Sequence, residues 1–188
     1  FKPRSNLNED KLSEQTRKQY PDATAIEKDL PNILIKLGFT SVRANEITSK
    51  ITVDAARGSG HAWGGQMKGQ KAHLRTRIPE GGTEYKGYNI AIHEFGHNVE
   101  QTISLYDVDY YMMNGVPNTA FTEALASVFQ KRDLDLLGIQ NNDPAKDALD
   151  ILDKAWHLAE IAGVSMFDIA VWKWLYENPN ATAFELKD

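Results

Sequence analysis

The sequence contains no cysteine among its 188 residues. This absence excludes disulfide bonds, a cysteine nucleophile and thiolate ligands to zinc. It leaves the compartment open, because export does not require disulfides, and both a cytoplasmic and an exported location are compatible with it. The sequence also lacks any apolar run close to the roughly 18 residues that a membrane-spanning helix needs. We therefore expect a soluble chain without a membrane span.

Neither sign of charge dominates. The 21 Lys and Arg residues stand against 26 Asp and Glu residues, and the net charge of −5 is spread along the chain. This balance argues against nucleic acid as a partner and against a polybasic membrane patch. Because the chain begins at Phe1 and not at Met, we expect a processed or truncated N-terminus. The length fits one domain over residues 1–188, or one lobe of a larger protein.

Histidine is scarce, with five in all, yet two stand four residues apart at His93 and His97, with Glu94 between them. On a helix this spacing places both imidazoles on one face, where they can bind one ion together. Glu94 is rotated by about 100° from His93, so it flanks the ion and can act on a bound water. Two neutral imidazoles suit Zn²⁺, and the carboxylate suits the proton transfer of a zinc peptidase.

The residues around this motif favour a partly buried helix. Apolar side chains recur at helical spacing, namely Tyr88, Ile92, Phe95, Val99 and Ile103. The pattern predicts a helix that starts near residues 84–87 and ends near Leu105. Two imidazoles and a carboxylate inside such a helix are costly to bury without a partner, and a metal ion is the partner we expect.

A zinc site with an open position needs a third protein ligand. The metzincin pattern has Gly and His at the positions where this chain has Glu100 and Ile103, so the third ligand of that pattern is missing. The alternative is a Glu on a following helix, and Glu123 lies in a predicted helix from Asn118 to Leu137, flanked by Phe121, Leu125, Val128 and Phe129. A di-iron site would need a second Glu-x-x-His pair, which the chain lacks.

Three segments together resemble a known family. They are HEFGH at 93–97, Phe-Thr-Glu-Ala at 121–124 and Gly-His-Ala at 60–62. In this combination the chain resembles the gluzincin metallopeptidases of the thimet oligopeptidase and oligoendopeptidase type, over about Arg57 to Gln130. The resemblance implies that His93, His97 and Glu123 bind zinc and that Glu94 is the general base. It also implies a zincin-like catalytic domain and peptide or protein substrates.

The sequence departs from the family at three places. Glu100 stands where the family often has a third His, and Leu125 to Ser127 replaces its usual Pro-Ser-Gln. The family also carries a Gly-rich loop with Tyr and His that stabilises the oxyanion, and no such loop is apparent before Asp188. A non-catalytic or incomplete metal-binding domain of a larger protein, acting in binding, is therefore the alternative function.

The fold class that we predict is mainly α (α+β), with a small β-sheet before the metal helix. Strict alternation over Ala72 to Ile78 predicts a half-buried strand, with Ala72, Leu74, Thr76 and Ile78 on its buried side. Zinc peptidases commonly pair a substrate backbone with an edge strand, and this strand is our candidate for that role. An ordinary hairpin strand with solvated basic residues is the alternative.

Further helices are predicted from their caps and breakers. One covers Ala23 to Leu37, capped by Asp22 and interrupted at Pro31, and a second covers Val42 to Lys50, capped by Thr40 or Ser41. Near the C-terminus we expect two helices. The first runs from Pro144 to Ile161, capped by Asp143 and closed by Gly163, and the second runs from Ser165 to Tyr176.

Some residues are candidates for supporting roles. A phenol near the zinc can stabilise an oxyanion, and the candidates are Tyr106, Tyr110 and Tyr111. The ligating imidazoles need hydrogen-bond acceptors behind them, and the sequence offers Asp54, Asp107 and Asp133 without choosing among them. His157, beside Trp156, is expected to be a packed or capping histidine.

Overall fold

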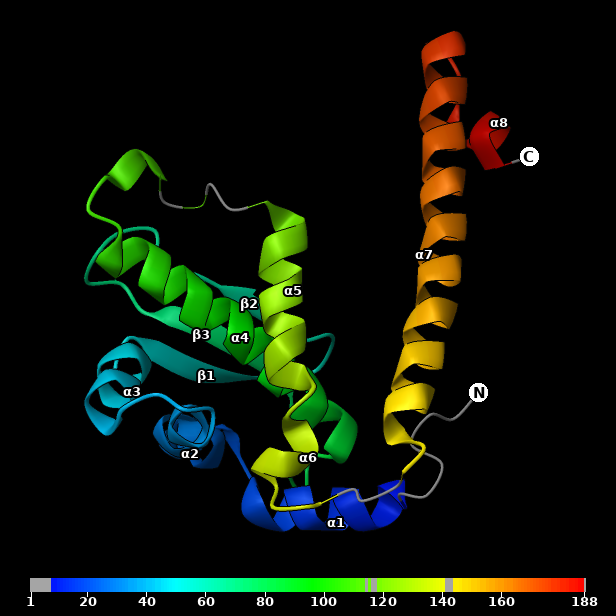
Figure 1. Ribbon diagram of the computed structural model, residues 1–188. Helices are drawn as coiled ribbons and strands as arrows, with labels where there is room; N and C mark the ends of the chain where they lie inside the picture. Colours follow the sequence, from blue (N-terminus) through cyan, green and yellow to red (C-terminus); the bar gives the residue numbers. More distant parts are fainter. Residues whose placement is uncertain (1–7, 114, 116–117, 141–143, 188) are drawn as a thin grey trace. The chain divides into compact units, whose positions relative to one another are not determined.

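The computed structural model describes residues 8–113, 115, 118–140 and 144–187. The chain divides into two compact units, whose described residues lie within 8–140 and 144–187. Both units are mainly helical, and the first also contains a small sheet (Figure 1). The prediction of a mainly α fold with a small sheet is confirmed. Among the described helices, none combines the length and the apolar character that crossing a membrane requires.

The first unit begins with helices and then forms its sheet and the helix that carries His93 and His97. Its elements are α1 (Glu9–Gln19), α2 (Ala23–Lys36), α3 (Ser41–Thr48), β1 (Ile51–Ala56), β2 (His61–Trp63), β3 (Ala72–Arg77), α4 (Tyr85–Asp107), a 3₁₀ turn (Tyr111–Met113), α5 (Thr119–Gln130) and α6 (Asp133–Leu136).

The first three helices begin at side-chain caps. Asn8 accepts backbone N–H bonds at the start of α1, Asp22 accepts one from Ala25, and Thr40 accepts one from Arg43. The predicted caps at Asp22 and Thr40 are thus confirmed. The predicted interruption at Pro31 is wrong, because α2 runs through it. Buried side chains on both sides of the proline hold the helix together, and they outweigh the lost backbone bond.

The sheet has the strand order β1-β3-β2. β1 pairs with β3 in parallel and β2 pairs with β3 antiparallel, with Val53 opposite Leu74 and Ala62 opposite the same residue. The predicted alternation in β3 is confirmed, since Ala72, Leu74 and Thr76 are buried. The prediction that this strand lies at an edge is wrong, because β3 is the central strand. Alternation reveals which side chains are buried, but not whether a strand has one neighbour or two.

Helix α4 lies against the sheet and forms the centre of the core (Figure 1). It starts within the predicted range and ends two residues after Leu105. Its buried apolar side chains belong to one core cluster with those of α1, α2, α3, α5 and the sheet. The largest fully buried apolar side chains of this core are Tyr20, Tyr88, Phe95, Leu30, Ile33, Leu34, Ile47, Ile51, Leu74 and Val99.

The helix predicted over Asn118 to Leu137 is broken in two. It starts as expected, with Asn118 accepting the backbone N–H of Ala120, but α5 ends at Gln130 and α6 begins at Asp133. Aspartate competes with the helix ladder by bonding to nearby backbone N–H groups. Here the Asp133 carboxylate accepts the N–H of Leu134 and is itself buried. The break therefore places a carboxylate inside the unit.

The second unit consists mainly of one long helix. α7 runs from Lys146 to Glu177 over 32 residues, and α8 covers Ala183–Lys187. The prediction of two helices separated at Gly163 is wrong. A glycine inside a helix costs only about 1 kcal/mol relative to alanine, which a long run of good helix formers overcomes. The predicted cap Asp143 lies outside the described residues.

Candidate metal centre

Helix α4 presents His93 and His97 from adjacent turns of one face. Their side chains are only 20% and 15% exposed, so both imidazoles are largely removed from water. The Nε2 atoms of the two rings face each other at 3.2 Å. Because the lone pairs of two imidazole nitrogens repel each other at this separation, a cation or a proton must lie between them.

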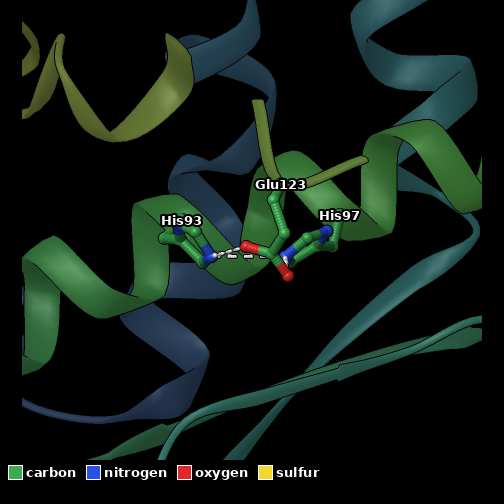
Figure 2. Close-up of side chains that lie close together, drawn as sticks. All are labelled: His93, His97 and Glu123. Atoms are coloured by element: carbon green, nitrogen blue, oxygen red, sulfur yellow. Dashed lines mark hydrogen bonds and ion pairs between the residues drawn. The ribbon is translucent and has the colours of Figure 1, made fainter. Parts of the chain in front are cut away.

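Glu123 on α5 approaches the same point. Its carboxylate oxygens lie 3.3 Å from Nε2 of His93 and 3.4 Å from Nε2 of His97 (Figure 2). Gly96 allows this approach, because a Cβ at that position would stand 2.8 Å from Cα of Ala126. The two helices are therefore in close backbone contact next to the site. The structure thus brings together the three residues that the sequence singled out.

The donor set fits a divalent metal ion. One ligand atom from each of His93, His97 and Glu123 lies within 4.8 Å of the others. In a tetrahedral zinc site, ligand distances of about 2.0–2.2 Å separate neighbouring donor atoms by roughly 3.3–3.6 Å. The two Nε2 atoms, 3.2 Å apart, are close to that range, and each also has one Glu123 oxygen nearby, Oε2 at 3.3 Å from His93 and Oε1 at 3.4 Å from His97. The Glu123 side chain is 54% exposed, so the site opens toward solvent on its side.

Glu94 lies on the side of α4 that faces β2. A Cβ added to Gly60 would stand 3.3 Å from Cγ of Glu94 and 2.4 Å from Cγ2 of Ile90. The backbone just before β2 therefore passes directly over this face of the helix, and only glycine fits there. Asn98 holds the other end of β2, because its Nδ2 donates to the carbonyl of Trp63 at 3.3 Å.

A cavity of about 360 Å³ adjoins the same face of α4. The backbone of 58–60, Arg77, Lys86 and Ile90 contribute to its lining. Ile90 stands one helical turn before Glu94, but none of His93, Glu94, His97 and Glu123 lines this cavity.

Two of the three aspartates that the sequence offers as supports for the imidazoles pair with other residues. Asp54 pairs with Nδ1 of His73 at 2.7 Å, and Asp107 pairs with Arg43. Nδ1 of His93 instead faces Oε1 of Gln130 at 3.2 Å. Sequence reasoning missed Gln130. The available signal was its position seven residues after Glu123, which places both on one face of α5.

The predicted tyrosines have other roles or positions. The Tyr106 hydroxyl accepts the backbone N–H of Gly69 at 2.8 Å, and Lys50 lies over its ring at 4.2 Å. Tyr110 is 66% exposed, and the Tyr111 side chain lies outside the described residues. The expectation for His157 is wrong, because it is exposed and faces Asp153 within α7 at 3.6 Å.

Glu100 stands three residues after His97 and is partly buried. Burial raises the pKa of its carboxyl above the ordinary value, and the nearby His97 opposes part of that shift.

No family model, curated protein sequence or solved structure matches the chain. The resemblance to gluzincin peptidases therefore depends on the residues of the motifs and on the geometry just described.

Proposed function

We propose that this chain is a zinc-dependent metallopeptidase with a zincin-like catalytic domain, in which His93, His97 and Glu123 hold one Zn²⁺ and Glu94 is the general base. The observation that carries the proposal is the convergence of two imidazoles and one carboxylate from two helices on a single point. A Glu next to the first of these histidines, on the helix face beside an edge strand, is the second supporting feature.

The reaction that fits this arrangement is hydrolysis of a peptide bond. When bound, zinc supplies Lewis acidity that polarises the carbonyl and acidifies a water molecule. Glu94 accepts a proton from the attacking water as the new C–O bond forms. It then delivers that proton to the amide nitrogen as the C–N bond breaks, so that the leaving group departs as an amine.

The substrate backbone has an edge strand to pair with, and that strand is β2 instead of β3. Among the described residues, β2 is paired on one side only, with β3. Gly60, the residue just before this strand, lies against Glu94. A peptide added along the free side of β2 would pass the proposed base and the cavity next to Ile90.

The test combines metal analysis with hydrolysis of a peptide mixture. We expect one Zn²⁺ per chain and measurable cleavage by the wild type. Glu94→Gln should retain zinc and lose about 10²- to 10⁴-fold in kcat, the usual contribution of a general base. Glu80→Gln, the same change at an exposed position, is the control and should retain both. Absence of zinc from the wild type, or undiminished cleavage by Glu94→Gln, would contradict the proposal.

A metal-binding domain without catalytic activity is the second candidate. The observation in its favour is that, among the described residues, no hydrogen bond joins Tyr106 or Tyr110 to the proposed ligands: the Tyr106 hydroxyl accepts the N–H of Gly69, and Tyr110 is largely exposed. Zinc bound at one per chain, with no cleavage of any peptide in the mixture, would favour this function.

A further inference from the structure

A buried carboxylate lies behind the metal centre. Asp133, at the start of α6, is 1% exposed. Its Oδ2 accepts hydrogen bonds from the Tyr85 hydroxyl and from Nδ2 of Asn89, both at 2.6 Å, and its Oδ1 accepts the N–H of Leu134 at 2.7 Å. Three donors thus converge on one carboxylate. Burial raises the pKa of the neighbouring Tyr88 hydroxyl, and the negative charge of Asp133 raises it further.

Two amide side chains connect Asp133 to His93. Nε2 of Gln130 donates to Oδ1 of Asn89 at 2.8 Å, and Oε1 of Gln130 faces Nδ1 of His93 at 3.2 Å. The chain of contacts therefore runs from Asp133 through Asn89 and Gln130 to His93. We call these four residues the relay. It involves α4, α5 and α6, and all four of its members are polar side chains that are partly or fully buried.

The relay has a direction, because an ionised carboxylate only accepts hydrogen bonds. Asn89 must turn its NH₂ group toward Asp133, so its oxygen faces Gln130. Gln130 must then turn its NH₂ group toward Asn89, so its oxygen faces His93. That oxygen is an acceptor, and the partner nitrogen, Nδ1 of His93, must carry the proton.

The opposite arrangement is unfavourable at each step. If Gln130 were reversed, its oxygen would face the oxygen of Asn89 with no proton between them. If Asn89 were reversed as well, its oxygen would face the carboxylate of Asp133. Each reversal removes a hydrogen bond from a partly buried place. The group that opposes the relay is Glu123, whose Oε2 lies 3.3 Å from Nε2 of His93 and can accept a proton held there.

We infer that Asp133, Asn89 and Gln130 are positioning residues that fix His93 as the tautomer with its proton on Nδ1 and its lone pair on Nε2, facing the metal position. This inference deepens the proposed function, and it rests on that function only in its expected effect on metal affinity. It assigns a role to the break between α5 and α6, since that break places Asp133 at the far end of the relay.

The first measurement is the tautomer of His93 in the metal-free protein, read from long-range ¹H–¹⁵N correlations at about pH 8.5, where imidazole is neutral. In the wild type we expect the proton on Nδ1. In Gln130→Leu, which keeps the shape but loses the acceptor, we expect the proton to move toward Nε2, because Glu123 lies 3.3 Å from that nitrogen. A purely structural role of Gln130 would not change this signal. Gln101→Leu, a similarly placed glutamine of α4 that bonds to Asn98, is the matched control and should match the wild type.

The second measurement is zinc affinity by competition with a chromophoric chelator. Residues that orient a ligating histidine usually contribute 10- to 100-fold, so we expect Gln130→Leu to weaken zinc binding by about that factor. Asp133→Asn should act in the same direction, because an amide can present either an oxygen or an NH₂ group to Asn89 and no longer imposes the direction. This isosteric variant serves the same purpose if Gln130→Leu fails to fold.

The two measurements test the relay and the proposed metal centre independently. Unchanged His93 tautomer and unchanged zinc affinity in both folded variants would overturn the relay. If the wild type binds no zinc, the proposed metal centre is wrong. The tautomer comparison still decides the relay in that case, because it is made without metal.

Discussion

The two long helices of this protein, α4 and α7, contrast in how they use their side chains. α4 has 23 residues and buries twelve of them, including Gly96 and Asn98. α7 has 32 residues, and none of its described side chains is buried. Many of its apolar side chains are exposed instead, namely Ile151, Leu152, Trp156, Leu158, Ile161, Val164, Met166, Phe167, Ile169, Trp172 and Tyr176.

The difference shows what distinguishes a site-bearing helix. Apolar side chains are frequent in both helices, so their number does not by itself locate chemistry. In α4 the polar residues of the inward faces have partners from other elements: Asn89 bonds to Asp133, His93 faces Gln130 and Asn98 bonds to Trp63. In α7 the recorded polar contacts run along the helix itself, as between Trp156 and Glu160. Buried polar groups with partners from distant segments mark the site.

The largest expected difference between α4 and α7 concerns the replacement of a histidine. His97→Ala removes one of three proposed ligands, and we expect zinc affinity to fall by about 10⁴-fold or more. His157→Ala makes the same change on α7 and should leave zinc affinity unaltered, since it faces only Asp153. Titration of both variants against a competing chelator measures the difference. Equal losses would mean that α7 takes part in metal binding.

Phenylalanine provides the next comparison. Phe95 is 0% exposed and packs edge to face against Phe129, whereas Phe167 is 72% exposed. Phe95→Ala should lower the free energy of unfolding by about 3–5 kcal/mol, because it removes a buried ring and leaves a cavity. Phe167→Ala should change it by less than about 0.5 kcal/mol. Urea unfolding followed by circular dichroism tests both values. A large loss in Phe167→Ala would show that this face of α7 is covered in solution.

The smallest expected difference between the two helices concerns the replacement of a glycine. Gly96→Ala would force a Cβ to 2.8 Å from Cα of Ala126, so α4 and α5 must separate. We expect a loss of about 1–3 kcal/mol in the free energy of unfolding and weaker zinc binding, because Glu123 moves with α5. Gly163 has nothing within 4 Å of its added Cβ, and Gly163→Ala should stabilise α7 by about 0.5–1 kcal/mol. Thermal melts of the two variants should shift in opposite directions, and a shift in the same direction would break the contrast.

The structural features that the sequence predicted best are those that neighbouring residues determine. The extent of α4 follows from apolar spacing, the caps Asp22 and Thr40 follow from side-chain chemistry, and the alternation of β3 follows from the pleat. The three proposed ligands were found because the geometry of a zinc site restricts the residue types and their spacing.

The rest depends on contacts between distant segments. The central position of β3 depends on its parallel pairing with β1, and alternation says nothing about that neighbour. The end of α5 at Gln130 depends on Asp133 bonding to Tyr85 and Asn89, more than forty residues earlier in the chain. Gln130 has no motif of its own, and its importance appears only when His93 is placed beside it.

The unequal exposure of the three proposed ligands has a kinetic consequence. When a zinc ion occupies the centre, a competing chelator meets Glu123 first, because that carboxylate is 54% exposed while the imidazoles are mostly enclosed. For the proposed metal centre we therefore expect exchange of the ion to start with release of the carboxylate, and the two histidines to dissociate last. The rate at which a chelator strips the metal should thus depend on the motion of a single side chain.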